Sequence, residues 1–225
     1  MDLSKSYDFF QPEKDTARVH IIGCGSVGSA IAENLVRCGV TRLSLWDFDT
    51  VEPKNIANQM FRAEDVGSPK VEALRDILID INPEANAEIE LHPEGWQGEL
   101  LSGYLFLAVD SVELRRKIVE THKFSTFVKA VFDVRTGLTD AQTFAANWSD
   151  YKSRQSLEKT MQFSDEDAAK ETPVSACGGV LGVVTTVRII SAYAVNNYIR
   201  FVKGEGFWKF LQLDCFTANM EAYDG

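Results

Sequence analysis

Cysteine and histidine are scarce in this chain of 225 residues, which has four cysteines and three histidines. No two cysteines form a C-x-x-C pair and the histidines lie far apart, so the sequence offers no tetrahedral zinc site. Scattered, unpaired cysteines are typical of a protein kept in a reducing compartment. These absences exclude a zinc-stabilised or disulfide-stabilised fold and favour a cytoplasmic location.

Long apolar runs are lacking as well. The most apolar stretch, Val180–Val195, is interrupted by Arg188 and is too short to cross a bilayer. The first residues, Met1–Lys5, lack the apolar centre of a signal peptide. We therefore expect a cytoplasmic protein without a membrane partner, in which the late apolar stretch forms a buried helix.

Basic residues are in the minority, with 23 Lys and Arg against 33 Asp and Glu and a net charge of −10. A surface for nucleic-acid phosphates needs concentrated Lys and Arg, so nucleic-acid binding is disfavoured. The hydrophobic fraction of 45% and charged fraction of 25% are typical of a globular protein. The length predicts a single domain over residues 1–225, with residues 1–17 as an N-terminal extension.

A glycine-rich turn follows the apolar run Val19–Ile22. Gly23, Gly25 and Gly28 have the spacing G-x-G-x-x-G, which suits a tight turn, a close backbone approach to phosphate, and a helix packed against a strand. Asp47 lies about 20 residues further on, where a carboxylate that binds ribose hydroxyls is expected. The pattern predicts a nucleotide site, and the alternative is a strand-to-helix turn with a purely structural role.

Strand-like and helix-like patterns alternate through the first half of the chain. We predict strands over residues 19–22, 42–47, 87–91, 104–109 and 127–134, and helices behind the glycine turn, over residues 69–81 and from 112 to about 122. Such alternation indicates a Rossmann-like α/β fold, with a mostly parallel sheet and helices on both faces. Asp47 and Asp110 would then lie at carboxyl ends of strands, where such sheets bind ligands.

The second half of the chain is different. Gly137–Pro173 is polar with few strand-like runs, and we predict a long excursion there with one short helix near Ser156. We assign residues 137–175 as a flexible crossover segment before the apolar helix. A last strand is predicted over Trp208–Phe216.

Several linked motifs resemble the ThiF/MoeB family, bacterial relatives of the ubiquitin-activating enzymes. After the glycine turn these are the D-x-D-x-V run of Asp47–Gln59, the G-x-x-K of Gly67–Lys70, the strand end Ala108–Ser111, and the late segment Ala176–Gly182. The resemblance covers about residues 18–202 and is more specific than the glycines alone. It implies ATP- and Mg²⁺-dependent adenylation of the C-terminal glycine carboxylate of a small ubiquitin-like protein or peptide, by a homodimer.

The resemblance also implies roles for individual residues. Asp47 would hold the ribose, Lys70 the phosphates, and Asp110 the Mg²⁺ ion or the attacking carboxylate. The implied nucleotide-binding set is Gly23, Gly25, Ser26, Gly28, Asp47, Asp49, Gln59 and Lys70. The implied catalytic set is Asn55, Arg62, Lys70 and Asp110.

Structural alternatives remain open for these residues. Lys70 could be a solvated helix lysine, Asp110 the N-cap of the next helix, and Asp49 a turn residue. Asn55 and Gln59 are four residues apart, so one helical turn could present both to a ligand, or both could be surface residues. Cys177 could be a nucleophile near a helix start, or a buried structural cysteine.

Two departures from the family pattern bear on activity. Ser26 stands where the family has a second consecutive glycine, and Asn58 stands where an arginine is expected before Gln59. We hypothesise that Arg62, one helical turn further on, supplies the missing guanidinium. A catalytically degenerate nucleotide-binding scaffold subunit is therefore an alternative function, and an NAD-dependent oxidoreductase is a third, which Lys70 argues against.

Overall fold

The computed structural model describes residues 1–167 and 182–225. The strands are β1 (Val19–Ile22), β2 (Leu43–Trp46), β3 (Glu90–His92), β4 (Gly103–Leu107), β5 (Val128–Thr136), β6 (Asp140–Asn147), β7 (Trp208–Asp214) and β8 (Asn219–Asp224). The α-helices are α1 (Ser26–Arg37), α2 (Lys70–Ile81), α3 (Val112–Thr121), α4 (Tyr151–Lys159) and α6 (Val184–Val202). Short 3-10 helices lie in the connections: η1 (Pro12–Lys14), η2 (Pro53–Ala57), η3 (Ala63–Asp65) and η4 (Pro83–Ala87).

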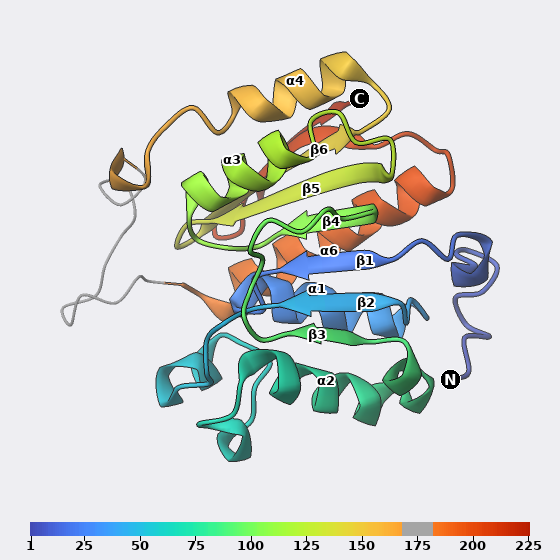
Figure 1. Ribbon diagram of the computed structural model, residues 1–225, viewed down its shortest axis with the longest axis vertical. Coiled ribbons are helices and arrows are strands. Elements are labelled where there is room, and N and C mark those ends of the chain that lie inside the picture. Colours follow the sequence, from blue (N-terminus) through green and yellow to red (C-terminus); the bar gives the residue numbers. More distant parts are fainter. Residues whose placement is uncertain (168–181) are drawn as a thin grey trace.

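One eight-stranded sheet organises the molecule, in the order β3-β2-β1-β4-β5-β6-β7-β8. Strands β1 to β5 pair in parallel, whereas β5 to β8 pair antiparallel. From β1 the chain moves outward through β2 and β3, then crosses to β4 on the other side of β1 (Figure 1). This reversal is the topological switch point, where α/β sheets bind ligands beyond the carboxyl strand ends.

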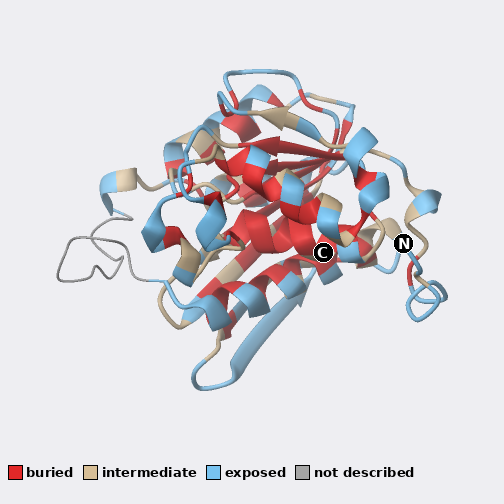
Figure 2. Cartoon of the chain, turned by 90° about the horizontal axis from the view of Figure 1, so that it is seen from below, coloured by how far each residue is buried: buried red, intermediate tan, exposed pale blue. Residues whose placement is uncertain are grey.

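Helices cover both faces of the sheet, which confirms the predicted Rossmann-like α/β fold. Apolar residues of α1, α2 and α6 form one core against the sheet, and those of α3 and α4 form a second core on the opposite face. Figure 2 shows the buried residues concentrated in the sheet and on the inner sides of the helices. The central strands β1, β2 and β4 are buried along their whole length, as continuous apolar runs require.

The segment that we predicted as a polar excursion with few strands is partly regular structure, so that prediction was wrong. Strand β6 (Asp140–Asn147) forms a hairpin with β5, closed by a hydrogen bond from Gly137 N–H to the Asp140 carbonyl at 2.8 Å. Its alanines and polar residues carry little intrinsic strand preference, and pairing with β5 and β7 supplies what the local sequence lacks. The short helix that we expected near Ser156 is α4.

Other element boundaries also shifted. The late helix spans Val184–Val202, later than the predicted 180–195, and β3 is displaced to Glu90–His92 because η4 occupies the residues before it. The last predicted strand ends at Asp214, and its hairpin partner β8 was missed because every residue of β8 is exposed. Within the described residues, no helix is long and apolar enough to cross a membrane.

Candidate nucleotide-binding site

The three glycines of the turn differ in what surrounds them. Gly23 has φ +92°, and a Cβ built there would lie 2.7 Å from the Ala108 carbonyl oxygen. A Cβ on Gly28 would lie 1.8 Å from the Gly23 carbonyl oxygen, so only glycine lets α1 pack this closely on β1. A Cβ on Gly25 meets nothing within 4 Å. Protein packing therefore requires Gly23 and Gly28, whereas the space beside Gly25 is open to a ligand.

Helix α1 begins at Ser26, directly after this open space. The first N–H groups of a helix have no acceptor within the helix and carry a partial positive charge, which favours an anion there. The Ser29 hydroxyl donates to the Ser26 carbonyl and accepts from Met60 N–H, both at 3.3 Å. These bonds attach the chain that follows η2 to the first turn of α1.

Asp47 is held against the glycine turn by two backbone donors. One carboxylate oxygen accepts from Cys24 N–H at 2.7 Å, and the other accepts from Asp49 N–H at 2.9 Å. Burial raises the pKa of Asp47, while the two N–H donors and the Lys70 ammonium act in the opposite direction. The carboxylate at the end of β2 is thus fixed in position beside the turn.

Lys70 lies close to Asp47 through its contact with Asp49. The ammonium is 2.7 Å from an Asp49 carboxylate oxygen, and Lys70 N–H donates to the Asp49 carbonyl at 2.9 Å. The Lys70 side chain is only 8% exposed, so it is not a solvated surface lysine. The fold therefore brings Asp47, Asp49 and Lys70 together at the carboxyl end of β2, where burial raises the pKa of Asp47 and the nearby Lys70 ammonium opposes that rise.

Asn55 and Gln59 lie in and just after η2. The Asn55 side-chain oxygen accepts from Glu52 N–H at 2.8 Å, and the Asn55 carbonyl accepts from Gln59 N–H at 2.9 Å, so Asn55 has a clear local structural role. The Gln59 side-chain oxygen is different, because it is buried and finds no hydrogen-bond donor among the described residues. A buried amide oxygen without a donor is costly, and a bound ligand is one way to satisfy it.

Asp110 follows β4 and does not cap α3. The cap is Ser111, whose hydroxyl accepts from Leu114 N–H at 3.1 Å. Across residues 1–167 and 182–225 the Asp110 carboxylate is exposed and enters no hydrogen bond or ion pair. The structural alternative considered for Asp110 therefore does not apply.

The Arg62 side chain does not join Asp47, Asp49 and Lys70. Its guanidinium pairs with Glu64, Asp65 and Asp80 at 3.1 to 3.3 Å. Asp80 lies ten residues after Lys70 in α2, which corresponds to about 15 Å along the helix. Arg62 is thus held by two carboxylates of η3 and by Asp80, which lies at the other end of α2 from Lys70.

The cysteines give no described nucleophile at this site. Cys24 is fully buried inside the glycine turn, and burial raises the pKa of its thiol well above the usual value. A thiol in such surroundings stays protonated and unreactive. Cys177, the candidate nucleophile of the sequence, lies outside the described residues.

Sequence reasoning overlooked two charged residues beside the site, Arg115 and Asp133. Arg115 has a side chain only 6% exposed and donates to the carbonyl of Val109, the residue before Asp110, and Asp133 is its fully buried partner. A signal was available, because Arg115 shares the apolar face of α3 with Ile118 and Val119. A charged residue on that face indicates a buried polar partner.

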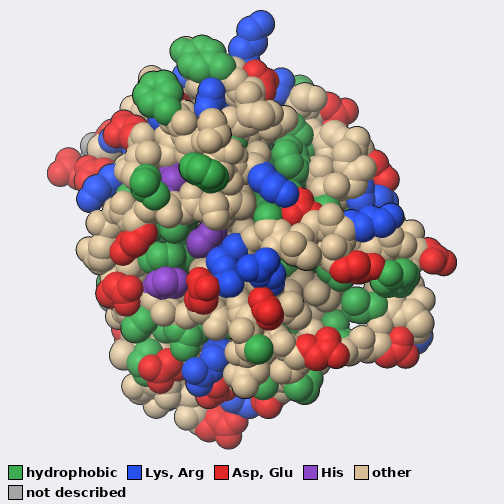
Figure 3. Space-filling view, turned by 45° about the vertical axis from the view of Figure 1, so that its right-hand side comes forward, with side chains coloured by type: hydrophobic (Ala, Val, Ile, Leu, Met, Phe, Trp, Pro, Cys, Tyr) green, Lys and Arg blue, Asp and Glu red, His purple; other side chains and the backbone are tan. Residues whose placement is uncertain are grey.

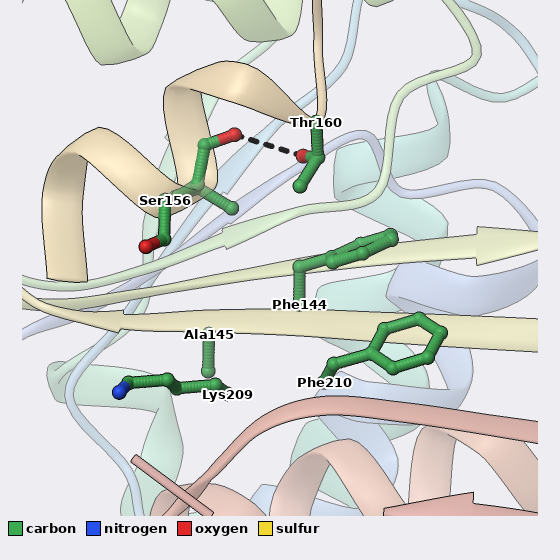
Figure 4. Close-up of a pocket in the computed structure, with 7 residues that line it drawn as sticks. Phe144, Ala145, Ser156, Thr160, Lys209 and Phe210 are labelled. Carbon is green, nitrogen blue, oxygen red and sulfur yellow. Dashed lines mark hydrogen bonds between the residues drawn. The ribbon is translucent and has the colours of Figure 1, made fainter. Parts of the chain in front are cut away.

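A hollow elsewhere on the protein contains none of the predicted site residues. It lies between α4 and the strands β6 and β7, where the rings of Phe144 and Phe210 face the gap (Figure 4). The face shown in Figure 3 carries acidic side chains interspersed with basic ones and no continuous basic surface. Neither feature competes with the glycine turn as a site for a phosphate-bearing ligand.

A mostly parallel sheet with a glycine turn and a fixed carboxylate at its switch point defines a Rossmann-like α/β protein. Within this class, the family model described as the ThiF family matches residues 8–224. The chain belongs to the ThiF family, as the linked motifs predicted.

One relative is similar over a short segment, and solved structures share the fold. A segment of 71 residues is 44% identical to ubiquitin-like modifier-activating enzyme 5 of Caenorhabditis elegans, covering 32% of this chain and 17% of that protein. The match thus spans less than a fifth of the relative. The structure of PaaA has a TM-score of 0.70 at 18% identity, covering 95% of this chain and 74% of PaaA. Escherichia coli MccB with ATP has a TM-score of 0.66 at 15% identity, covering 94% of this chain and 65% of MccB.

Proposed function

We propose that this protein binds ATP with Mg²⁺ and adenylates the C-terminal glycine carboxylate of a small ubiquitin-like protein or peptide. The observation that carries the proposal is the convergence of Asp47 and the Lys70 ammonium beside the open space at Gly25. A protein that binds ATP needs a carboxylate for the ribose and a cation for the phosphates, no further apart than the length of the nucleotide. The adenylating class follows from the ThiF family and from the name of the related modifier-activating enzyme.

Each residue takes a role that its surroundings support. Asp47 accepts hydrogen bonds from the ribose hydroxyls, and the first turn of α1 and Lys70 receive the phosphates. Asp49 positions Asp47 through its backbone N–H, and its carboxylate pairs with the Lys70 ammonium until a phosphate takes its place. The unsatisfied oxygen of Gln59 provides a further acceptor for the ligand.

Magnesium would be held at this site by one carboxylate together with the phosphates of ATP. No group of three His, Cys, Asp or Glu side chains that could hold a metal is found in the part of the chain that the structure describes. Mg²⁺ is commonly held by one or two carboxylates together with substrate phosphates and water. Asp110 is a suitable carboxylate, since it is exposed and unpaired within the described residues. When bound, the ion would neutralise charge on the phosphates.

A binding experiment tests the nucleotide site. Isothermal titration with ATP and Mg²⁺ should give heat of binding, and titration with NAD should give none, which separates this function from the oxidoreductase alternative. Lys70→Met removes the ammonium and should weaken ATP binding by about 10- to 100-fold, the value of a charge-assisted hydrogen bond. Lys123→Met is the matched control, because Lys123 also pairs with a carboxylate, Glu158 at 3.0 Å, outside the site. Equal affinities for both variants would contradict the role of Lys70.

The catalytically degenerate scaffold remains a second candidate, and the surroundings of Arg62 favour it. An enzyme of this type needs cations to neutralise the reacting phosphates, yet Arg62 is paired with Glu64, Asp65 and Asp80. Exchange of labelled pyrophosphate into ATP separates the two functions. A synthetic peptide ending in Gly-Gly should support exchange by an active enzyme, whereas the same peptide with a C-terminal amide should not. Binding of ATP without pyrophosphate exchange in the presence of the Gly-Gly peptide would support the scaffold function.

A further inference from the structure

Arg115 and Asp133 form a buried ion pair next to the candidate site. Their side chains are 6% and 0% exposed. Arg135 also donates to Asp133, from Nε at 2.9 Å and from Nη2 at 2.6 Å. One carboxylate therefore serves two guanidinium groups. Buried charges persist only when their hydrogen bonds are well matched, so the orientation of Arg115 is closely fixed.

Arg115 also donates to the Val134 carbonyl of β5 at 3.1 Å, and two further bonds reach the turn that carries Asp110. Nη1 donates to the Leu107 carbonyl at 3.2 Å, and Nη2 donates to the Val109 carbonyl. Strand β4 ends at Leu107, so the residues that follow Ala108 are no longer held by pairing within the sheet. The two carbonyls flank Ala108, whose backbone lies against Gly23 of the glycine turn. Arg115 thus holds the backbone on the approach to Asp110 from inside the protein.

We propose that Arg115, oriented by Asp133, is a positioning residue that holds Asp110 in place to hold Mg²⁺ beside the nucleotide. The proposal rests on the function proposed above. Arg115 itself touches neither metal nor nucleotide. It fixes the Leu107–Asp110 backbone, so that an exposed carboxylate with no protein partner among the described residues keeps one orientation. An aspartate on an unsupported turn would lose entropy each time it took up the ion.

The test measures how strongly Mg²⁺ strengthens ATP binding, as the ratio of the dissociation constants in EDTA and in Mg²⁺. Arg115→Lys keeps the charge beside Asp133, but a single ammonium cannot span both carbonyls. We expect this variant to lose about tenfold of the Mg²⁺ effect, while its affinity for ATP in EDTA stays unchanged. Asp110→Asn should lose a similar amount, and the double variant no more than either single one, because both act through one carboxylate.

Arg116→Lys is the matched control. Arg116 is the next residue of α3 and donates to the carbonyls of Met161 and Phe163 at 2.6 and 2.8 Å, without contacting the Asp110 turn. It should keep the full Mg²⁺ effect. A full effect in Arg115→Lys, or additive losses in the double variant, would overturn the proposal. If the wild-type chain binds no ATP in either buffer, it is the proposed function that fails.

Hydrogen exchange over residues 107–112 provides a readout that needs no ligand. Faster exchange in Arg115→Lys than in wild type and in Arg116→Lys supports the positioning role, and equal exchange contradicts it. Should Arg115→Lys fail to fold, the wild-type chain still decides the question. The Ala108 amide donates to the Ile22 carbonyl at 2.8 Å, at the start of this turn. Protection of that amide comparable to the amides of β4 agrees with a held backbone, whereas rapid exchange there refutes it.

Discussion

Replacing Gly28 by alanine should force α1 away from β1. The added Cβ would lie 1.8 Å from the Gly23 carbonyl oxygen and 3.1 Å from Cγ2 of Ile21. Carbon and oxygen ordinarily approach to about 3.3 Å, so the start of α1 would have to move by roughly 1.5 Å. Gly23 cannot yield easily, because its own position is fixed against Ala108.

The loss in the free energy of unfolding depends on the kind of atom that the added Cβ contacts. Overpacking a core against side chains usually costs about 1 to 3 kcal/mol. Here the obstacle is backbone, so we expect a loss of about 3 kcal/mol in the free energy of unfolding, a large part of the roughly 5 to 15 kcal/mol of a typical protein. Such a loss corresponds to a fall in Tm of about 6 to 12 °C for a chain of this size.

Urea unfolding followed by circular dichroism measures the effect, with Gly25→Ala as the matched control. Gly25 precedes α1 at φ −72°, and its added Cβ meets nothing. The control should lose about 1 kcal/mol or less, the difference between glycine and alanine as an N-cap. It should nevertheless weaken ATP binding, because the methyl group would enter the open space. Equal stabilities of the two variants would refute the packing explanation of the glycine spacing.

Two further predictions concern titratable groups in the core. Burial lowers the pKa of His20 to about 4, so between pH 6.5 and pH 4 only the unfolded chain takes up a proton at this residue. The free energy of unfolding should therefore fall by about 3 kcal/mol as the pH is lowered through that window. Urea titrations should show a weaker dependence of the unfolding free energy on pH for His20→Gln than for the wild type. The buried Cys24 thiol, whose pKa is raised by burial, should resist iodoacetamide until urea unfolds the chain; mass spectrometry detecting rapid labelling of Cys24 in the native protein would contradict its burial.

The glycine turn and the strand ends could be predicted because their signals are local. The spacing of Gly23 and Gly28 specifies backbone that must approach closely, and the apolar runs of β1 and β4 specify strands buried on both faces. The position of Asp47 at the end of β2 follows from the same alternation. These features need no knowledge of distant parts of the chain.

The remaining features depend on contacts between distant residues. Strand β6 forms because β5 and β7 pair with it on either side, and β8 forms because it pairs with β7. The choice between Asp110 and Ser111 as the cap of α3 depends on which side chain reaches Leu114 N–H, and both residue types are good caps. The Arg115–Asp133 pair joins α3 to β5, and no local pattern specifies the partner of a buried charge.

The Asp49–Lys70 ion pair determines how a phosphate group competes for Lys70. Asp49 is 52% exposed, and an ion pair with one solvated partner is worth about 0 to 1 kcal/mol. A hydrogen bond from the ammonium to phosphate is worth about 1.5 to 3 kcal/mol. The incoming phosphate should therefore displace the Asp49 carboxylate rather than share the ammonium with it.

Asp49→Asn tests this competition directly. The substitution removes a competing negative charge while the backbone N–H that holds Asp47 remains, so ATP should bind a few-fold more tightly in titration calorimetry. Asp76→Asn is a suitable control, because Asp76 is an exposed acidic residue of α2 paired with Arg75, and it should leave the affinity unchanged. Weaker binding of ATP by Asp49→Asn would mean that Asp49 contacts the nucleotide or its Mg²⁺ ion, and would refute the competition with phosphate.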